Sequence, residues 1–112
     1  MKIYHNPRCR KSREGVQYLT DKKLNFEIID YLKEGVSEDD IKSILKKLNM
    51  SAIEIVRKNE KIWKDNFKGK ELKEEQIISI LCEEPKLIER PIIVHKNKAV
   101  IGRPKENIDN LL

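Results

Sequence analysis

The sequence predicts a single α/β domain, and three observations lead to that prediction. The chain has 112 residues, which is enough for one modest hydrophobic core and too few for two. Residues 2–31 carry strand, helix and strand signals in turn, and residues 92–112 return to strands before a closing helix. Between them, about 37–89, apolar residues follow helical spacing. We therefore expect one domain over residues 1–112 with a helical insertion in its middle.

The N-terminal segment predicts a strand–helix–strand unit. Residues 2–5 favour a short strand that ends at the turn pair Asn6-Pro7. Residues 10–23 have the spacing of a helix, and residues 26–31 are rich in the aromatic and β-branched side chains of a strand. Such a βαβ unit implies two parallel strands joined by a right-handed crossover.

The middle of the chain predicts a run of helices that begin at capping signatures. Ser37 with Asp40 resembles a capping box, and so does Ser51 with Glu54. The first helix is expected to stop at Asn49, and the second to continue through Arg57. The expected helical segments are residues 37–49, 51–57 and 74–83, whereas residues 60–72 are ambiguous between a short helix and a charged loop.

The C-terminal segment predicts a hairpin and a last helix. Ile92–Val94 and Ala99–Ile101 are the two strands, and Pro104 suits the first position of the helix. A βαβ unit, helices and a ββα unit follow one another in the thioredoxin-like fold with a helical insertion. Element order alone leaves several α/β folds open.

The excess positive charge lies in one part of the chain. The formal net charge is +5, and residues 1–23 account for all of it, with seven basic against two acidic side chains. We do not expect a nucleic-acid surface there, because aromatic side chains that could stack on bases are scarce. An electropositive setting for a thiolate and an anion fits better, since Cys9 lies within this segment.

Composition also limits the class of protein. No run of about 18 apolar residues is present to cross a membrane, and the first residues lack the apolar core of a signal peptide. Cys9 and Cys82 are the only cysteines, too few for a disulfide scaffold or a zinc site. We expect a cytoplasmic protein with reduced thiols, no metal and no bound cofactor.

Cys9 is the candidate nucleophile. It follows a strand and a turn and opens a helix, whose free N–H groups and dipole favour a thiolate and can also hold an oxyanion. His5 and Arg13 flank it as His-x-x-x-Cys-x-x-x-Arg, and Ser12 completes Cys-x-x-Ser. Because Ser12 replaces a second cysteine, turnover needs an external thiol, or Cys82 as a distant resolving residue. The apolar neighbours of Cys82 favour a place in the core instead.

Three arginines are candidate anion ligands. Arg57 follows the second capping signature, whereas Arg90 and Arg103 each precede a proline beside a predicted strand end. The planar guanidinium group suits bidentate contact with tetrahedral oxyanions.

Four segments together carry a family resemblance. IYHNPRCRKSR, VRKN, ERPIIV and GRPKEN resemble the glutaredoxin-dependent arsenate reductases in sequence, order and spacing, over nearly the whole chain. The resemblance implies a thioredoxin-like fold, a nucleophilic Cys9, and an oxyanion clamp of Arg57, Arg90 and Arg103. It also implies a cis peptide before Pro91. In such proteins the residues matching His5 and Ser12 are thought to lower the pKa of the cysteine.

The implied activity is reduction of arsenate to arsenite, a step in arsenic resistance. Glutathione would be the co-substrate, glutaredoxin the protein partner, and the protein would act as a monomer. Two alternatives stay open at this point. One is a redox-sensitive regulator that binds RNA polymerase, against which Ser12 speaks because such members usually carry Cys-x-x-Cys. The other is a general glutathione-dependent thiol reductase.

Overall fold

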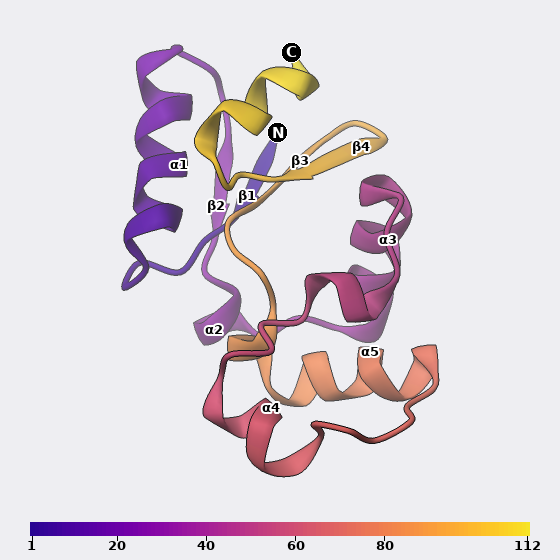
Figure 1. The fold of residues 1–112 in the computed structure, drawn as a ribbon. Coiled ribbons are helices and arrows are strands. Elements are labelled where there is room, and N and C mark those ends of the chain that lie inside the picture. Colours follow the sequence, from indigo (N-terminus) through magenta and orange to yellow (C-terminus); the bar gives the residue numbers. More distant parts are fainter.

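The computed structural model describes all residues from 1 to 112, and a four-stranded sheet lies at its centre (Figure 1). The strand order is β2-β1-β3-β4. β1 (Lys2–Tyr4) runs parallel to β2 (Glu27–Ile29) and antiparallel to β3 (Ile92–His95). β3 then pairs antiparallel with β4 (Lys98–Ile101), which completes the hairpin. The predicted βαβ unit and C-terminal hairpin are both confirmed; β2 is three residues shorter than expected, and the other strands differ from the prediction by one residue.

The first crossover helix is α1 (Arg10–Asp21), close to the predicted 10–23. A one-turn helix that the sequence did not predict, α2 (Tyr31–Glu34), follows β2 directly. Asp30 caps it, because its side chain accepts a hydrogen bond from the backbone N–H of Lys33 at 3.3 Å. The chain therefore turns away from the sheet at Asp30, and Tyr31 belongs to a helix instead of the predicted strand.

The insertion confirms two of the predicted helices almost residue for residue. α3 (Glu38–Leu48) starts at a capping box in which Ser37 and Asp40 satisfy each other's backbone N–H groups. It ends at Asn49, which adopts the left-handed conformation with φ 57°. α5 (Glu74–Glu83) has the predicted bounds, and the ambiguous stretch before it contains a short helix, α4 (Lys61–Asn66).

The helix predicted over residues 51–57 is wrong in extent. The capping box at Ser51 forms, but only a 3₁₀ helix, η1 (Ala52–Ile55), follows it. Val56 is extended and forms an isolated antiparallel bridge with Ile88, next to a second 3₁₀ helix, η2 (Pro85–Leu87). Pairing with this distant segment replaces the helical hydrogen bonds, so Arg57 lies beyond the helix and not near its end. The closing helix after Pro104 is also of the 3₁₀ type, η3 (Lys105–Leu111).

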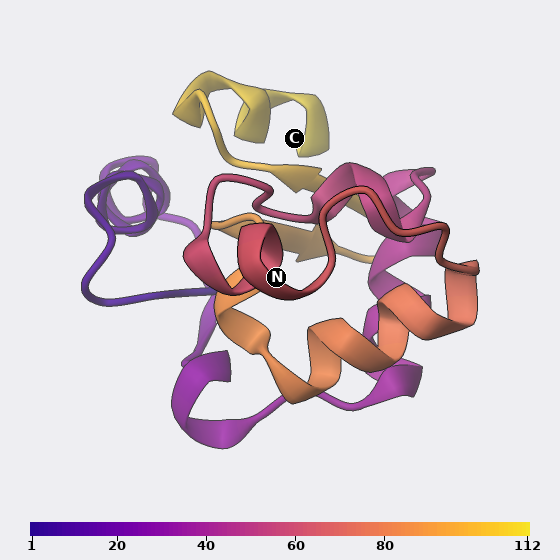
Figure 2. The ribbon, with the colours of Figure 1, turned by 60° about the horizontal axis from the view of Figure 1, so that its bottom comes forward.

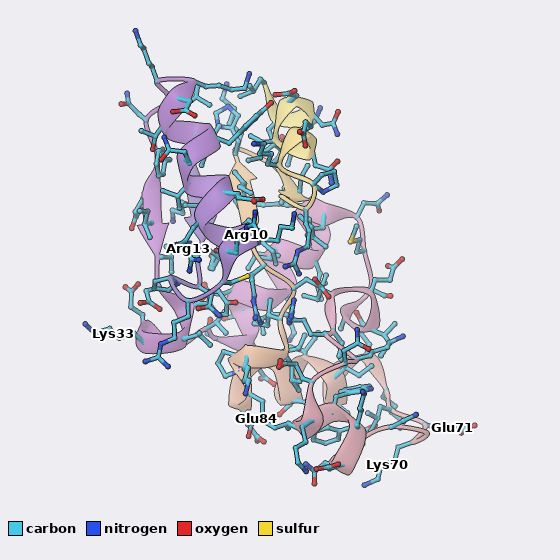
Figure 3. The ribbon with its side chains drawn as sticks, turned by 60° about the vertical axis from the view of Figure 1, so that its left-hand side comes forward. Arg10, Arg13, Lys33, Lys70, Glu71 and Glu84 are labelled. Carbon is cyan, nitrogen blue, oxygen red and sulfur yellow. The ribbon has the colours of Figure 1, made fainter.

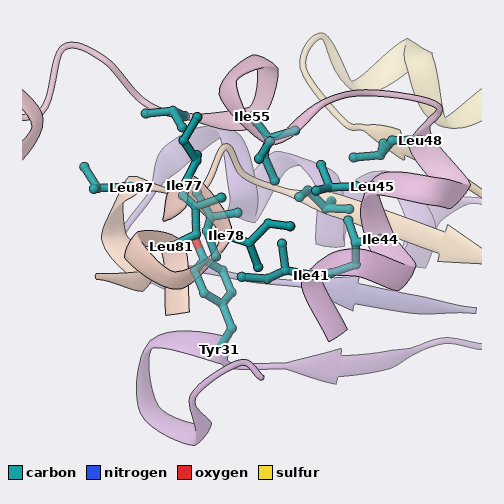
Figure 4. Close-up of a cluster of buried hydrophobic side chains, with 14 of the residues drawn as sticks. Tyr31, Ile41, Ile44, Leu45, Leu48, Ile55, Ile77, Ile78, Leu81 and Leu87 are labelled. Atoms are coloured by element: carbon teal, nitrogen blue, oxygen red, sulfur yellow. The ribbon is translucent and has the colours of Figure 1, made fainter. Parts of the chain in front are cut away.

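Helices cover both faces of the sheet (Figure 2), and a hydrophobic cluster lies on each face. Ile3 and Ile93 are cross-strand partners that face α1 and η3, where Leu19 and Ile108 pack on them. Ile92 and Val94 point to the other face and join the larger cluster with α3, η1 and α5. The pleat thus gives each face its own core. Figure 4 shows the larger cluster, in which the Tyr31 ring points from α2 toward Leu81. None of the helices has the length and apolar character needed to span a membrane.

Candidate active site

Cys9 lies at the N-cap of α1, as the sequence predicts. Its backbone is extended (φ −95°, ψ 122°), and its carbonyl accepts the first hydrogen bond of the helix from the N–H of Arg13 at 3.0 Å. Its own N–H donates to the Asn6 carbonyl at 3.0 Å, which closes the turn from β1. Arg10 and Arg13 mark this end of α1 in Figure 3. The thiol is therefore placed at the positive end of the helix dipole.

The surroundings of the thiol favour its ionised form. Arg103 Nη2 lies 3.8 Å from Cys9 Sγ. Partial burial by itself would raise the pKa of Cys9, but hydrogen bonds from the Arg90 guanidinium and from the backbone N–H groups of Ser12 and Lys11 outweigh it, so the pKa is lowered. The nucleophilic thiolate is thus more populated than in a free cysteine.

The Ser12 and His5 side chains hold the loop that carries the thiol. Ser12 Oγ is fully buried, lies 2.7 Å from His5 Nδ1 and accepts a hydrogen bond from the backbone N–H of Asn6 at 2.9 Å. Burial lowers the pKa of His5, despite the opposing effect of Asp30, so the ring is neutral at pH 7. His5 therefore brings no positive charge to the thiolate. An acidifying effect of these two side chains on Cys9 stays a prediction, and it would act through the position of the loop.

Arg13 also supports the loop instead of the sulfur. Its Nη1 donates to the Pro7 carbonyl at 2.9 Å, across the turn that precedes Cys9. His5 and Arg13, which flank the cysteine symmetrically in sequence, thus both stabilise the turn before Cys9. His5 does so from a buried position and Arg13 from an exposed one.

The fold gathers the three predicted arginines in the region of Cys9, although they come from three segments. Arg103 Nη2 lies 3.8 Å from the sulfur, whereas Arg90, which donates to the Lys86 carbonyl at 3.2 Å, lowers the pKa of Cys9. Arg57 and Arg103 meet at a common neighbour, because the Nη1 atoms of both lie 3.8 Å from Glu89 Oε2. All three side chains are partly buried. This cluster of guanidinium groups around one thiol is the main feature of the site.

Several polar atoms of this region have no partner. Arg57 Nε, Arg90 Nε and the Tyr31 hydroxyl are buried without a hydrogen bond. A buried donor left unpaired costs about 1–3 kcal/mol, so three in one region are an unusual concentration.

Tyr31 and Glu89 are the residues that sequence reasoning missed. The Tyr31 side chain is 1% exposed, and burial raises its pKa to about 12. The charges of Cys9 and Glu89 act in the same direction, whereas those of Arg90 and Arg57 oppose it, so Tyr31 lies within electrostatic reach of the site. Glu89 had one available signal, since it directly precedes Arg90 in a motif that already stood out.

Pro91 follows Arg90 directly and packs against both the helix of Cys9 and the chain that leads to Arg103. The predicted cis bond before it is confirmed, and the Arg103–Pro104 bond is cis as well. A Cβ atom at Gly15 of α1 would lie 2.9 Å from Pro91 Cγ, and one at Gly102 would lie 3.1 Å from it. The helix that starts at Cys9 and the strand that leads to Arg103 thus both approach Pro91 closely, and at Gly15 the approach is one that only glycine allows.

Cys82 lies elsewhere, next to the last residue of α5. It is partly buried and packs against the larger cluster, as its apolar neighbours predict. Burial raises its pKa, and the charges of Glu38, Asp40 and Glu83 add to that effect. Both cysteines are free thiols. No group of His, Cys, Asp or Glu is arranged to hold a metal ion.

Comparison with known proteins agrees on one family. The model of the ArsC family matches residues 4–111. A protein named YfgD from Escherichia coli K12 is 42% identical over 110 residues, covering 96% of this chain and 92% of its own. An arsenate reductase from Haemophilus influenzae is 36% identical over 112 residues, covering 98% and 97%.

Among solved structures, an arsenate reductase from Vibrio cholerae superposes with a TM-score of 0.94 at 34% identity, covering 100% of this chain and 98% of the other. The helical insertion is therefore part of the shared fold and not a peculiarity of this sequence. The chain belongs to the ArsC family and has the thioredoxin-like fold of its arsenate reductases.

Proposed function

We propose that the protein reduces arsenate to arsenite, with the Cys9 thiolate as nucleophile. The observation that carries the proposal is a thiol with a lowered pKa that Arg103 contacts, in a region where the buried Nε atoms of Arg57 and Arg90 have no acceptor. An oxyanion among Arg57, Arg90 and Arg103 would bring oxygens to such donors. The arsenate reductases of Haemophilus influenzae and Vibrio cholerae support arsenate as that oxyanion.

In the first step the Cys9 thiolate attacks arsenic(V) and forms a sulfur–arsenic bond. One arsenate oxygen leaves as water after it takes up a proton. The guanidinium groups stabilise the charge that accumulates on the remaining oxygens. One well-placed donor of this kind is typically worth about 3 kcal/mol of transition-state stabilisation.

In the second step a glutathione thiolate attacks the Cys9 sulfur. The sulfur–arsenic bond breaks with its electron pair on arsenic, which leaves as arsenite, and a Cys9–glutathione disulfide forms. The two thiols have then supplied the two electrons. Ser12 cannot resolve the disulfide, so glutaredoxin reduces it with further glutathione. Phosphate would occupy the same site but is not reduced by a thiol, so it should inhibit competitively.

The test is arsenate-dependent NADPH oxidation coupled through glutathione reductase, glutathione and glutaredoxin. Arg57→Ala, Arg90→Ala and Arg103→Ala should each weaken arsenate use by roughly 100-fold, following the donor energy above. The corresponding Lys variants should recover only part, because a point charge keeps the attraction but loses the fork. Alkylation of Cys9 by neutral iodoacetamide should fall far less, since that reaction presents no oxyanion.

Two results would contradict the proposal. If all three Ala variants kept the wild-type arsenate efficiency, the clamp would not exist. If the protein reduced mixed disulfides equally well with and without the arginines, and did not turn over arsenate, it would be a general thiol reductase.

A further inference from the structure

Glu89 is the acidic residue beside the arginines of the site, and binding of an anion does not by itself explain it. Its carboxylate stands between two of the three arginines, with Oε2 3.8 Å from Arg57 Nη1 and 3.8 Å from Arg103 Nη1. These separations are beyond hydrogen-bond length, and no side chain or backbone group donates to the carboxylate. A negative charge with free acceptor oxygens therefore lies where a negative ligand is expected.

The position of Glu89 is fixed by the backbone. Its N–H donates to the Ile55 carbonyl at 2.8 Å, and the N–H of Arg57 donates to the Leu87 carbonyl at 2.7 Å. These two bonds flank the bridge between Val56 and Ile88, so Arg57 and Glu89 are held side by side on paired segments. The Glu89 side chain is 25% exposed and so is largely shielded from water. It is thus a built part of the site and not a mobile surface group.

A carboxylate in such a place discriminates between ligands by their protons. It is an acceptor only, so it repels an oxygen without a proton and accepts a hydrogen bond from an oxygen that carries one. At neutral pH arsenate and phosphate retain a proton, whereas sulfate, with the same tetrahedral shape, retains none. A site built to bond a ligand hydroxyl rejects the analogue that lacks it far more strongly than shape alone would allow.

We infer that Glu89 accepts a hydrogen bond from the protonated oxygen of the bound anion, and so restricts the site to protonated tetrahedral oxyanions. Hydrogen arsenate and hydrogen phosphate belong to that class, and sulfate is excluded from it. The inference rests on the proposed function only in placing the anion between the arginines at Cys9.

Binding can be measured without turnover, by the protection of Cys9 from iodoacetamide. The probes are phosphate, arsenate and sulfate at pH 7.5, titrated at constant ionic strength with chloride, in a Cys82→Ser background. In the protein with Glu89, phosphate and arsenate should protect at concentrations roughly 10- to 100-fold below sulfate, the factor expected when an acceptor is left facing an unprotonated oxygen. This comparison requires no substitution in the site, so it does not depend on whether a site variant folds.

Glu89→Gln sharpens the test, since it removes the charge and keeps the shape. The sulfate concentration needed to protect Cys9 should fall until it is within a few-fold of the phosphate concentration. A few-fold is roughly the net contribution of one ordinary hydrogen bond. The matched control is Glu71→Gln, which changes the net charge equally at a position remote from Arg10 and Arg13 (Figure 3). It should leave the tenfold or larger preference intact.

Each outcome decides the question. Equal protection by sulfate and phosphate in the unchanged protein would overturn the inference, and so would an equal gain for all three anions in Glu89→Gln, because Glu89 would then act only by general repulsion. If the phosphate preference holds and Glu89→Gln removes it, the inference stands even where the coupled assay shows no arsenate turnover. That result would overturn only the proposed reaction.

Discussion

The two cysteines occupy opposite ends of helices, and their chemistry differs accordingly. Cys9 lies at the start of α1, where Arg90 and backbone N–H groups lower its pKa, and Cys82 lies at the end of α5, where burial and three carboxylates raise the pKa. Both thiols are partly exposed. Accessibility therefore does not distinguish a reactive thiol from an inert one in this protein. The end of the helix and the sign of the surrounding charge do.

The largest effects are expected when each thiol is removed in turn, which tests whether Cys9 alone is required. Cys9→Ser should abolish arsenate turnover, a loss of roughly 10³-fold or more for a nucleophile. Cys82→Ser should keep close to the wild-type rate, because no cysteine lies near the active turn to form a relay. The coupled NADPH assay measures both. A collapse of turnover in a stably folded Cys82→Ser protein would instead show that an internal disulfide forms during the cycle.

The pH dependence of alkylation tests the difference between the two cysteines more finely. In two single-thiol proteins, Cys82→Ser and Cys9→Ser, the rate of reaction with iodoacetamide follows the thiolate fraction. The midpoint for Cys9 should lie below the ~8.5 of a free cysteine, and that for Cys82 above it. Arg90→Ala should move the Cys9 midpoint upward, toward that of Cys82. Coincident profiles for the two thiols would remove the electrostatic account.

Only the Cys9 end of the molecule carries a buried histidine. The pKa of His5 is lowered in the folded protein. The unfolded chain therefore takes up a proton first as the pH falls below ~6.5, and folding stability is lost from there down to the folded-state pKa. His5→Asn should flatten this part of the stability curve. Urea midpoints at several pH values between 7 and 5 would show it, and an unchanged slope would mean that His5 titrates normally.

The smallest effect is expected from the packing of Cys82. Cys82→Ala removes one sulfur atom from the edge of the larger cluster, and the free energy of unfolding should fall by about 1 kcal/mol or less. Urea unfolding measures this. A loss of several kcal/mol would mean that the sulfur fills a tighter space than its partial exposure implies.

Much of this architecture was predictable because local signals and tertiary contacts agree. Ser37 and Asp40 open α3, and Asn49 closes it as expected. The same signature at Ser51 and Glu54 forms its capping box but starts only one turn of 3₁₀ helix, since the next residues pair with the Ile88 segment. That partner is more than 30 positions away in the chain, so no local pattern announces it.

The residues of the candidate site also fall into those that the sequence predicts and those that it does not. Cys9 and the three arginines were predictable, because each residue type suits oxyanion chemistry and each stands in a motif that can be seen in sequence. Tyr31 and Glu89 were not, because their significance lies in what they face. Tyr31 looked like the end of a strand, and its buried hydroxyl is visible only once α2 turns it inward. Glu89 looked like one of many charged residues until the bridge placed it beside Arg57.

The contact of Gly15 and Gly102 with Pro91 has a consequence for how this sequence can change. A methyl group at Gly15 meets the rigid proline ring at 2.9 Å, and one at Gly102 meets that ring at 3.1 Å and Ile93 Cδ1 at 2.7 Å. To avoid either overlap, α1, Pro91 or the chain that leads to Arg103 must move. The Cys9 sulfur then changes its position relative to the arginines. In a saturation mutagenesis screen for arsenate tolerance, even alanine at these positions should score with the arginine variants, although neither glycine touches the substrate.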